Sequence, residues 1–178
     1  MSTNVQGSVK TKQRTVPRPL ATVTDLKPDG VRAIADAVNP LIADAFALYV
    51  KTKNFHWHLA GPRFRDYHLL FDEHAAAIFE SIDVLAERVR KIGGTTVRSI
   101  GHIGRLQSIP DDDDDYVPAS EMMRRLLVDN QRMAERQRAA IRLCDSHADT
   151  PTWNLLQDIL DQTERRTWFL YELTQDDR

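Results

Sequence analysis

The sequence has few of the residues that disulfides, turns and membrane spans require. Its 178 residues include one cysteine, Cys144, with 7 glycines and 8 prolines. A lone cysteine excludes an intramolecular disulfide and the paired-cysteine motifs of redox proteins and zinc ribbons. No uninterrupted apolar run approaches the roughly 18 residues that a membrane span needs, and the first twenty residues are too polar for a secretory leader. We therefore expect a cytoplasmic protein with no membrane partner.

Charge is nearly balanced in total but uneven along the chain. There are 24 basic and 26 acidic residues, for a net charge of -2. Residues 1–20 carry +4 and the rest carry -6, because the first twenty residues contain no acid. We expect 1–28 to be a basic flexible tail and 29–175 to form one folded domain. The tail residues suited to DNA phosphates are Lys10, Lys12, Arg14 and Arg18.

Apolar residues recur at spacings of three and four over four long stretches, which is the period of an α-helix. The predicted helices end at Gly61-Pro62 and at Gly93-Gly94, and begin after Pro118 and at Thr150-Pro151. We expect Pro40 to kink or restart the first helix. The linker between the second and third helices has about 25 residues, which is unusually long, and its apolar residues predict a short helix. This pattern indicates an all-α, ferritin-like four-helix bundle with a long crossover.

The second predicted helix carries a polar stripe beside its apolar seam. At about 100° per residue, His68, Asp72, Asp83 and Glu87 fall within about 100° of one another. Imidazole and carboxylate groups suit divalent iron, manganese or zinc, although such a stripe is also compatible with a solvated face that pairs with nearby arginines. Asp72 and Asp83 lie about 16 Å apart along the helix, too far for one ion.

Two copies of this helix, antiparallel about a two-fold axis, would bring the two halves of the stripe together. The His68/Asp72 end of each copy would then lie beside the Asp83/Glu87 end of the other, forming two equivalent shared sites. His56 would add a second imidazole if the Gly61-Pro62 turn folds the first two helices into a hairpin.

The segment HWHLAGPRFRDYHLLFDEHAAAIFESIDVLAERVRKIGG resembles the ferroxidase motif of the Dps family of small ferritin-like proteins. It contains HW, a histidine twelve residues later, an aspartate, and a D-x-x-x-E pair. The resemblance implies a hollow dodecamer of two-fold dimers that oxidises Fe²⁺ with hydrogen peroxide, or with dioxygen, and stores ferric oxyhydroxide, protecting DNA. It implies di-iron sites between subunits, at which zinc or manganese substitutes, with the ligands His56, His68, Asp72, Asp83 and Glu87.

The resemblance extends to residues outside this ligand set. Trp57 either intercepts radicals or packs at a subunit interface, and Glu73 is either a mineral-nucleating acid or a solvated one. Asp145 and Asp149 correspond to acids that line an iron pore, with helix capping as the alternative for Asp149. We expect His58 to lie at the surface or an interface rather than to be a ligand, and His74, His102 and His147 to be ordinary polar residues. The acidic run 111–115 is expected to be a solvated loop, with a weak attraction for cations as the alternative.

Three other functions are alternatives to a Dps-type ferroxidase. Classical ferritins build intrasubunit sites from Glu-x-x-His motifs, and none of the seven glutamates has a histidine three residues later. A non-enzymatic, DNA-compacting and nucleoid-associated shell would use the basic tail. A purely structural helical shell would lack ferroxidase activity.

Overall fold

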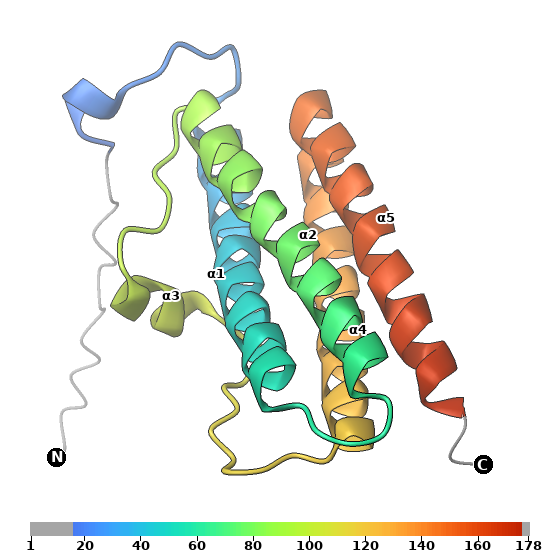
Figure 1. Cartoon of the computed structure of the whole chain (residues 1–178). Helices are drawn as coiled ribbons and strands as arrows, with labels where there is room; N and C mark the ends of the chain where they lie inside the picture. The colour runs from blue at the N-terminus through green and yellow to red at the C-terminus, as the bar shows by residue number, and fades with distance from the viewer. Residues whose placement is uncertain (1–15, 176–178) are drawn as a thin grey trace, which may run out of the picture.

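The computed structural model describes residues 16–175, which contain helices and no strand. The elements are η1 (Arg18–Leu20), α1 (Pro28–His58), α2 (Phe64–Lys91), α3 (Ile100–Leu106), α4 (Ala119–Ser146) and α5 (Thr150–Leu173). Two helical hairpins, α1 with α2 and α4 with α5, pack into a bundle, and the crossover between them carries α3 along α1 (Figure 1). The predicted ferritin-like four-helix bundle with a short helix in its crossover is confirmed.

The predicted apolar seams form the bundle core. The seam expected on the first helix is buried throughout; its residues are Ile34, Val38, Leu41, Ala45, Leu48, Thr52, Phe55 and Leu59. On the second helix only Phe64, at the first turn, is exposed among Phe64, Phe71, Ala75, Ile78, Ile82, Leu85, Val89 and Ile92. The largest fully buried side chains come mainly from α1, α2 and α4, because these helices direct their period-3.6 apolar residues toward one axis.

The first helix differs from expectation in two ways. It is a single helix that contains Pro40, so of the kink or restart expected there, the restart does not occur. It is also long and apolar enough on average to meet a membrane-span criterion, although it lacks a long uninterrupted apolar run. Its apolar residues fill the bundle core, and it also buries the charged residues Asp44 and Lys51. We conclude that α1 is a core helix of the bundle.

Two buried polar connections hold the crossover and α4 against α1. The Asp44 carboxylate accepts hydrogen bonds from the backbone N–H groups of Ser108 (2.5 Å) and Ile109 (3.1 Å). The Lys51 ammonium donates to the Asp129 carboxylate at 2.6 Å, and both side chains are almost fully buried. Since buried charges are tolerated only when they are paired, the first contact holds the crossover, and the second holds α4, in place against α1.

The segment before α1 contacts the far end of α2. The Arg90 guanidinium donates to the Leu20 carbonyl at 2.7 Å, and the Thr22 hydroxyl donates to the Arg90 carbonyl at 3.1 Å. Arg18 is exposed on η1. The other basic residues of the expected tail, Lys10, Lys12 and Arg14, lie outside the described residues.

Candidate metal centre

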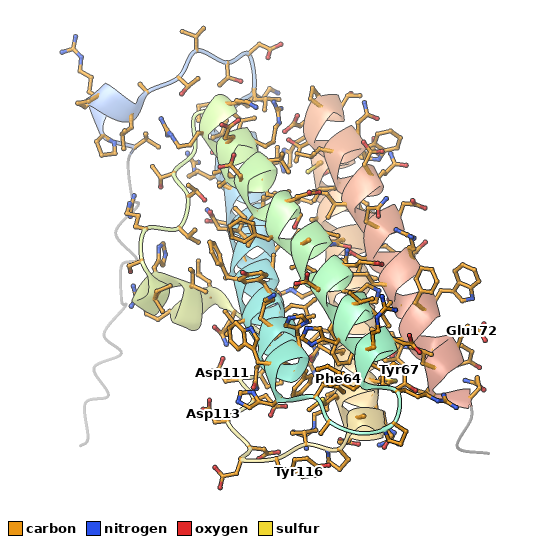
Figure 2. All side chains as sticks on the ribbon, in the orientation of Figure 1. Phe64, Tyr67, Asp111, Asp113, Tyr116 and Glu172 are labelled. Carbon is orange, nitrogen blue, oxygen red and sulfur yellow. The ribbon has the colours of Figure 1, made fainter. Side chains whose placement is uncertain are left out.

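The turn between α1 and α2 brings His56 and His68 into direct contact. Gly61 has a φ of 118°, a left-handed conformation that glycine adopts without a steric penalty, and it allows the short reversal between the helices. The two imidazole rings stack with centroids 3.7 Å apart and an interplanar angle of 21°. Phe64 lies at the start of α2 (Figure 2), and its ring also stacks on that of His68, with the centroids 4.9 Å apart. The hairpin required for a second imidazole is therefore present.

Each histidine is hydrogen-bonded to the backbone of the other. His56 Nδ1 lies 2.8 Å from the His68 carbonyl oxygen, and His68 Nδ1 lies 3.0 Å from the His56 carbonyl oxygen. A carbonyl oxygen only accepts, so each Nδ1 carries the hydrogen, and the neutral ring has its lone pair on Nε2. This is the tautomer that binds metals through Nε2, with the other ring nitrogen donating to a backbone carbonyl.

Asp72 lies one helical turn beyond His68 and is already paired with a cation. Its Oδ1 accepts a hydrogen bond from the Lys53 ammonium of α1 at 2.7 Å. This hydrogen bond and the Lys53 charge lower the pKa of Asp72 below its usual value. The carboxylate is therefore ionised at neutral pH, and a metal ion at Asp72 must compete with Lys53.

The other two predicted ligands lie elsewhere on α2. Asp83 and Glu87 are exposed, and Glu87 forms an ion pair with Lys91 at 3.1 Å. Within residues 16–175, no group of three or more histidine, cysteine, aspartate or glutamate side chains is arranged to hold a metal ion. One copy of the chain therefore provides two separate donor sets, with His56, His68 and Asp72 in one and Asp83 and Glu87 in the other.

A metal site inside the bundle is disfavoured by a buried arginine. The Arg166 guanidinium, 5% exposed, donates to Asn130 Oδ1 at 3.0 Å and to the Thr163 hydroxyl at 2.8 Å, and burial lowers its pKa to about 10. His74, expected to be an ordinary polar residue, is buried as well. Burial, and then the charge of Arg166, lower its pKa to about 4. A divalent ion at this level of the bundle would face a fixed positive charge.

The remaining predicted site residues occupy varied positions. Trp57 is 63% exposed, with the Lys53 ammonium 5.9 Å from its ring centroid, and Glu73 and Asp145 are exposed. Asp149 is buried and accepts hydrogen bonds from the Thr152 backbone N–H (3.2 Å) and from Arg88 (2.6 Å). In the single chain, Asp149 therefore caps the N-terminus of α5, which was the alternative to a pore-lining role.

Exposed apolar side chains accompany the ligand stripe on α2. Leu69 and Phe79 are about half exposed, and at about 100° per residue they fall within about 100° of His68, on the face that carries Asp72 and Asp83. Trp57 and Val50 are exposed on the adjacent α1. A surface of this kind is typical of a protein–protein contact.

A four-helix bundle with a helix-bearing crossover and a histidine–carboxylate stripe on its second helix defines a ferritin-like protein. A family model for the ferritin-like domain matches residues 35–178. An uncharacterized low temperature-induced protein of Nostoc sp. is 32% identical over 156 residues, or 87% of this chain and 86% of the relative. DNA protection during starvation protein 1 of Deinococcus radiodurans is 28% identical, covering 83% and 71% of the two chains.

Among solved structures, DpsC from Streptomyces coelicolor superposes with a TM-score of 0.84 at 29% identity, covering 92% of this chain and 95% of that one. The chain belongs to the Dps family within the ferritin-like superfamily.

Proposed function

We propose that the protein is a ferroxidase and iron store whose oxidation sites are each shared by two subunits. His56, His68 and Asp72 of one subunit face Asp83 and Glu87 of the partner subunit. The observation that carries this proposal is the reciprocal hydrogen bonding of the two histidines, which leaves the Nε2 lone pair available on each of two adjacent, stacked rings.

The donor set suits iron as substrate. Imidazole nitrogens and carboxylate oxygens bind Fe²⁺, and zinc or manganese can take its place. Two Fe²⁺ ions held together supply two electrons to one hydrogen peroxide, which with two protons gives two Fe³⁺ and two water molecules and releases no hydroxyl radical. Dioxygen is the alternative oxidant. The ferric product is stored in the cavity of a homododecamer in the cytoplasm.

The geometry of the single chain supports a shared site over an internal one. Arg166 disfavours a site within the bundle, and the two donor sets are too far apart on α2 to act together. The half-exposed Phe79 and Leu69 on the same stripe give a partner an apolar surface to cover. Trp57, on the adjacent helix, contributes either packing against the partner or an oxidisable ring beside the site.

A subunit-mixing experiment tests the shared site. The variants His68→Ala and Asp83→Ala are each expected to lose rapid oxidation of Fe²⁺ by peroxide. When the two are dissociated, mixed in equal amounts and reassembled, half of the dimers are hybrid, and each hybrid regains one intact site of two. Recovery of about a quarter of the wild-type rate is expected. No recovery, with dimers formed normally, would contradict sharing, and full activity in both single variants would refute the site itself.

A second function, DNA binding, is suggested by the excess of basic residues in 1–20. Many tails on one shell would add weak phosphate contacts by avidity, with a steep dependence on salt. The test is a gel-shift at low salt after deletion of residues 1–20, and unchanged DNA retention would contradict a role for the tail.

A further inference from the structure

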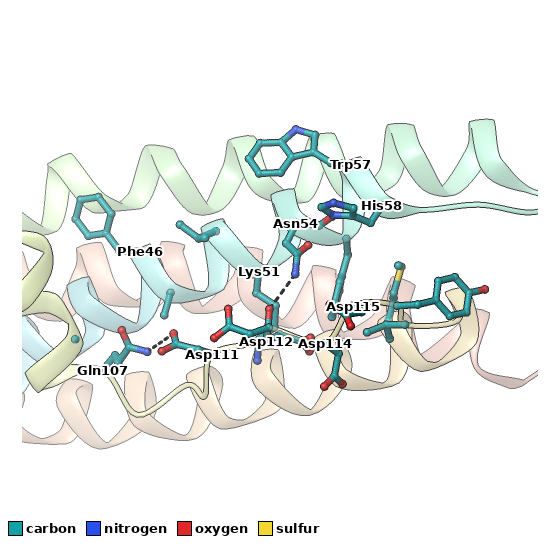
Figure 3. A pocket seen from close by; sticks show the side chains of 18 of the residues that line it. Phe46, Lys51, Asn54, Trp57, His58, Gln107, Asp111, Asp112, Asp114 and Asp115 are labelled. Carbon is teal, nitrogen blue, oxygen red and sulfur yellow. Dashed lines mark hydrogen bonds between the residues drawn. The ribbon is translucent and has the colours of Figure 1, made fainter.

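A pocket of about 690 Å³ lies between α1, α3 and the crossover segment 111–117 (Figure 3). Val50 and Trp57 of α1 line it, and both belong to the exposed apolar surface that the proposed shared site turns toward the partner subunit. The pocket therefore opens on the contact between the two subunits of a dimer. The partner subunit is the nearest source of a side chain to fill it.

The acidic run 111–115 lines the pocket with all five of its residues and is only partly neutralised. Arg125 pairs with Asp112 at 2.8 Å and with Asp114 at 2.7 Å. Asp113 and Asp115 are exposed and form no hydrogen bond or ion pair within residues 16–175. The Asp112 side chain is only 4% exposed, so the expectation of a solvated loop is wrong at this residue.

Asp112 also has an oxygen without a donor. Its Oδ2 accepts from Arg125, but its buried Oδ1 has no hydrogen-bond partner among the described residues. A buried carboxylate oxygen without a donor is destabilising, so the pocket is suited to a donor that carries a positive charge. An arginine side chain combines a planar fork of donors with an apolar stem that packs against an apolar wall.

The proposed two-fold pairing determines which part of the partner subunit lies opposite this pocket. In that pairing the two copies of α2 are antiparallel, with His68 level with Glu87 of the partner subunit. Within each subunit, His56 of α1 is level with His68 of α2. Position 54 of one α1 is therefore level with position 39 of the other, to within about 3 Å. The pocket is at this level, because the Asn54 side chain donates to the Asp112 carbonyl at 3.1 Å.

The start of the crossover lies on the same face of α1 at the level of position 39. The Asn39 side chain donates to the Thr95 carbonyl at 2.9 Å, which holds this segment on α1. At about 100° per residue, Asn39 falls within about 20° of Val50 and Trp57 around α1, so the segment lies on the face that a partner covers. Arg98, three residues after Thr95, is exposed and forms no hydrogen bond or ion pair within residues 16–175.

We propose that Arg98 of the partner subunit enters the pocket and pairs with the acidic run, donating to Asp112 Oδ1 and to the exposed carboxylates beside it. This contact rests on the proposed shared site, because it uses the same two-fold pairing. Three extended residues span about 10 Å, so the anchor at Thr95 leaves Arg98 within reach of the pocket. By symmetry each dimer contains two such contacts, and the acidic run selects a second copy of this chain as its partner.

Cross-linking between subunits tests the contact without reference to iron oxidation. Arg98→Cys and Asp113→Cys subunits are prepared separately, dissociated, mixed, reassembled and oxidised. A disulfide between positions 98 and 113 is expected, and mass spectrometry identifies it. Because the two substitutions are on different chains, only a contact between subunits forms this bond. The matched control, Arg98→Cys mixed with Asp161→Cys of α5, should give no disulfide between the substituted positions.

Charge reversal provides a second readout. Arg98→Glu turns a like charge toward the run and should weaken dimer association at low salt by about 10-fold, measured by sedimentation, since both contacts of each dimer are lost. Arg98→Lys should associate nearly as well as the wild type. Adding Asp113→Lys/Asp115→Lys to Arg98→Glu should restore association. The matched control Arg142→Glu makes the same change on α4 and should associate as the wild type does.

Two results would overturn the proposal: no disulfide between positions 98 and 113 in the mixture, or equal weakening by Arg98→Glu and Arg142→Glu. The subunit-mixing assay of iron oxidation separates this failure from failure of the shared site. Recovered oxidation without the disulfide would overturn this contact alone, whereas loss of both would overturn the two-fold pairing itself. If Arg98→Glu does not fold, the cross-link still decides the question.

Discussion

Replacing Lys53 by methionine is expected to tighten metal binding at Asp72. The Lys53 ammonium lies 2.7 Å from Asp72 Oδ1, in the position from which it opposes an incoming cation. Methionine retains most of the side-chain length and removes the charge. The pKa of Asp72 would rise toward its usual value, because the Lys53 hydrogen bond is the main cause of its lowering. The carboxylate would still be ionised at neutral pH.

The size of the effect follows from the distance. A zinc–carboxylate bond of about 2.1 Å places the metal at most about 4.8 Å from the ammonium, if Lys53 does not move. The repulsion between charges of +1 and +2 at this separation is about 1.7 kcal/mol in water, and at physiological salt it falls to about 1 kcal/mol. The dissociation constant for Zn²⁺ should therefore fall by about 5- to 20-fold.

Isothermal titration with Zn²⁺, a metal that cannot be oxidised at the site, measures this change without turnover. Lys53→Arg, which keeps the charge, should bind zinc as weakly as the wild type. In the Asp72→Asn background, Lys53→Met should no longer change the dissociation constant for zinc. High salt should reduce the increase in zinc affinity that Lys53→Met produces, because salt screens the repulsion. Unchanged or weaker zinc binding by Lys53→Met would refute the competition and show that the ammonium instead holds Asp72 in its binding position.

Three further predictions concern the packing of the bundle. Asp129→Asn leaves the buried Lys51 ammonium unpaired and should cost about 3–5 kcal/mol in urea unfolding, whereas the apolar pair Lys51→Met/Asp129→Leu should regain most of this; an equal loss in both would contradict the pairing argument. Gly94→Ala would place a β-carbon 2.9 Å from a valine methyl and should cost about 1–3 kcal/mol, while Gly104→Ala, which meets nothing within 4 Å, should be neutral or stabilising; equal effects would be inconsistent with this contact. His74 has a folded pKa of about 4 against an ordinary 6.5, so both states are neutral above pH 6.5, and stability is lost as pH falls from 6.5 to 4, where only the unfolded state gains the proton. Relative to His74→Leu, the wild type should lose up to about 3 kcal/mol over this range, and parallel pH profiles would rule out this linkage.

The helices and one half of the candidate site could be predicted because they depend on local periodicity. The three-four spacing of apolar residues specifies which face of each helix is buried, and it predicted the seam of α1 completely. The contact between His56 and His68 followed from the short glycine-containing turn between the two helices. Such features need only the geometry of neighbouring segments.

Features that depend on long-range packing could not be predicted. Arg166, His74 and Asp112 are polar residues whose burial is decided by which partner another helix places beside them, and the spacing within their own segment does not contain that information. The pairing of Lys53 with Asp72 likewise depends on the relative rotation of α1 and α2. Sequence periodicity therefore predicted the histidine–carboxylate stripe on α2 without identifying the cation beside it.

The two reciprocal histidine bonds also determine how α1 and α2 are aligned along their axes. Sliding α2 by one residue, about 1.5 Å, would disturb both bonds, because each joins a side chain on one helix to the backbone of the other. The two imidazoles therefore hold the helices of the hairpin in one axial register. Asp83 and Glu87 lie further along the same rigid helix. The register that the histidines set near the start of α2 therefore also sets the axial position of these two carboxylates relative to α1.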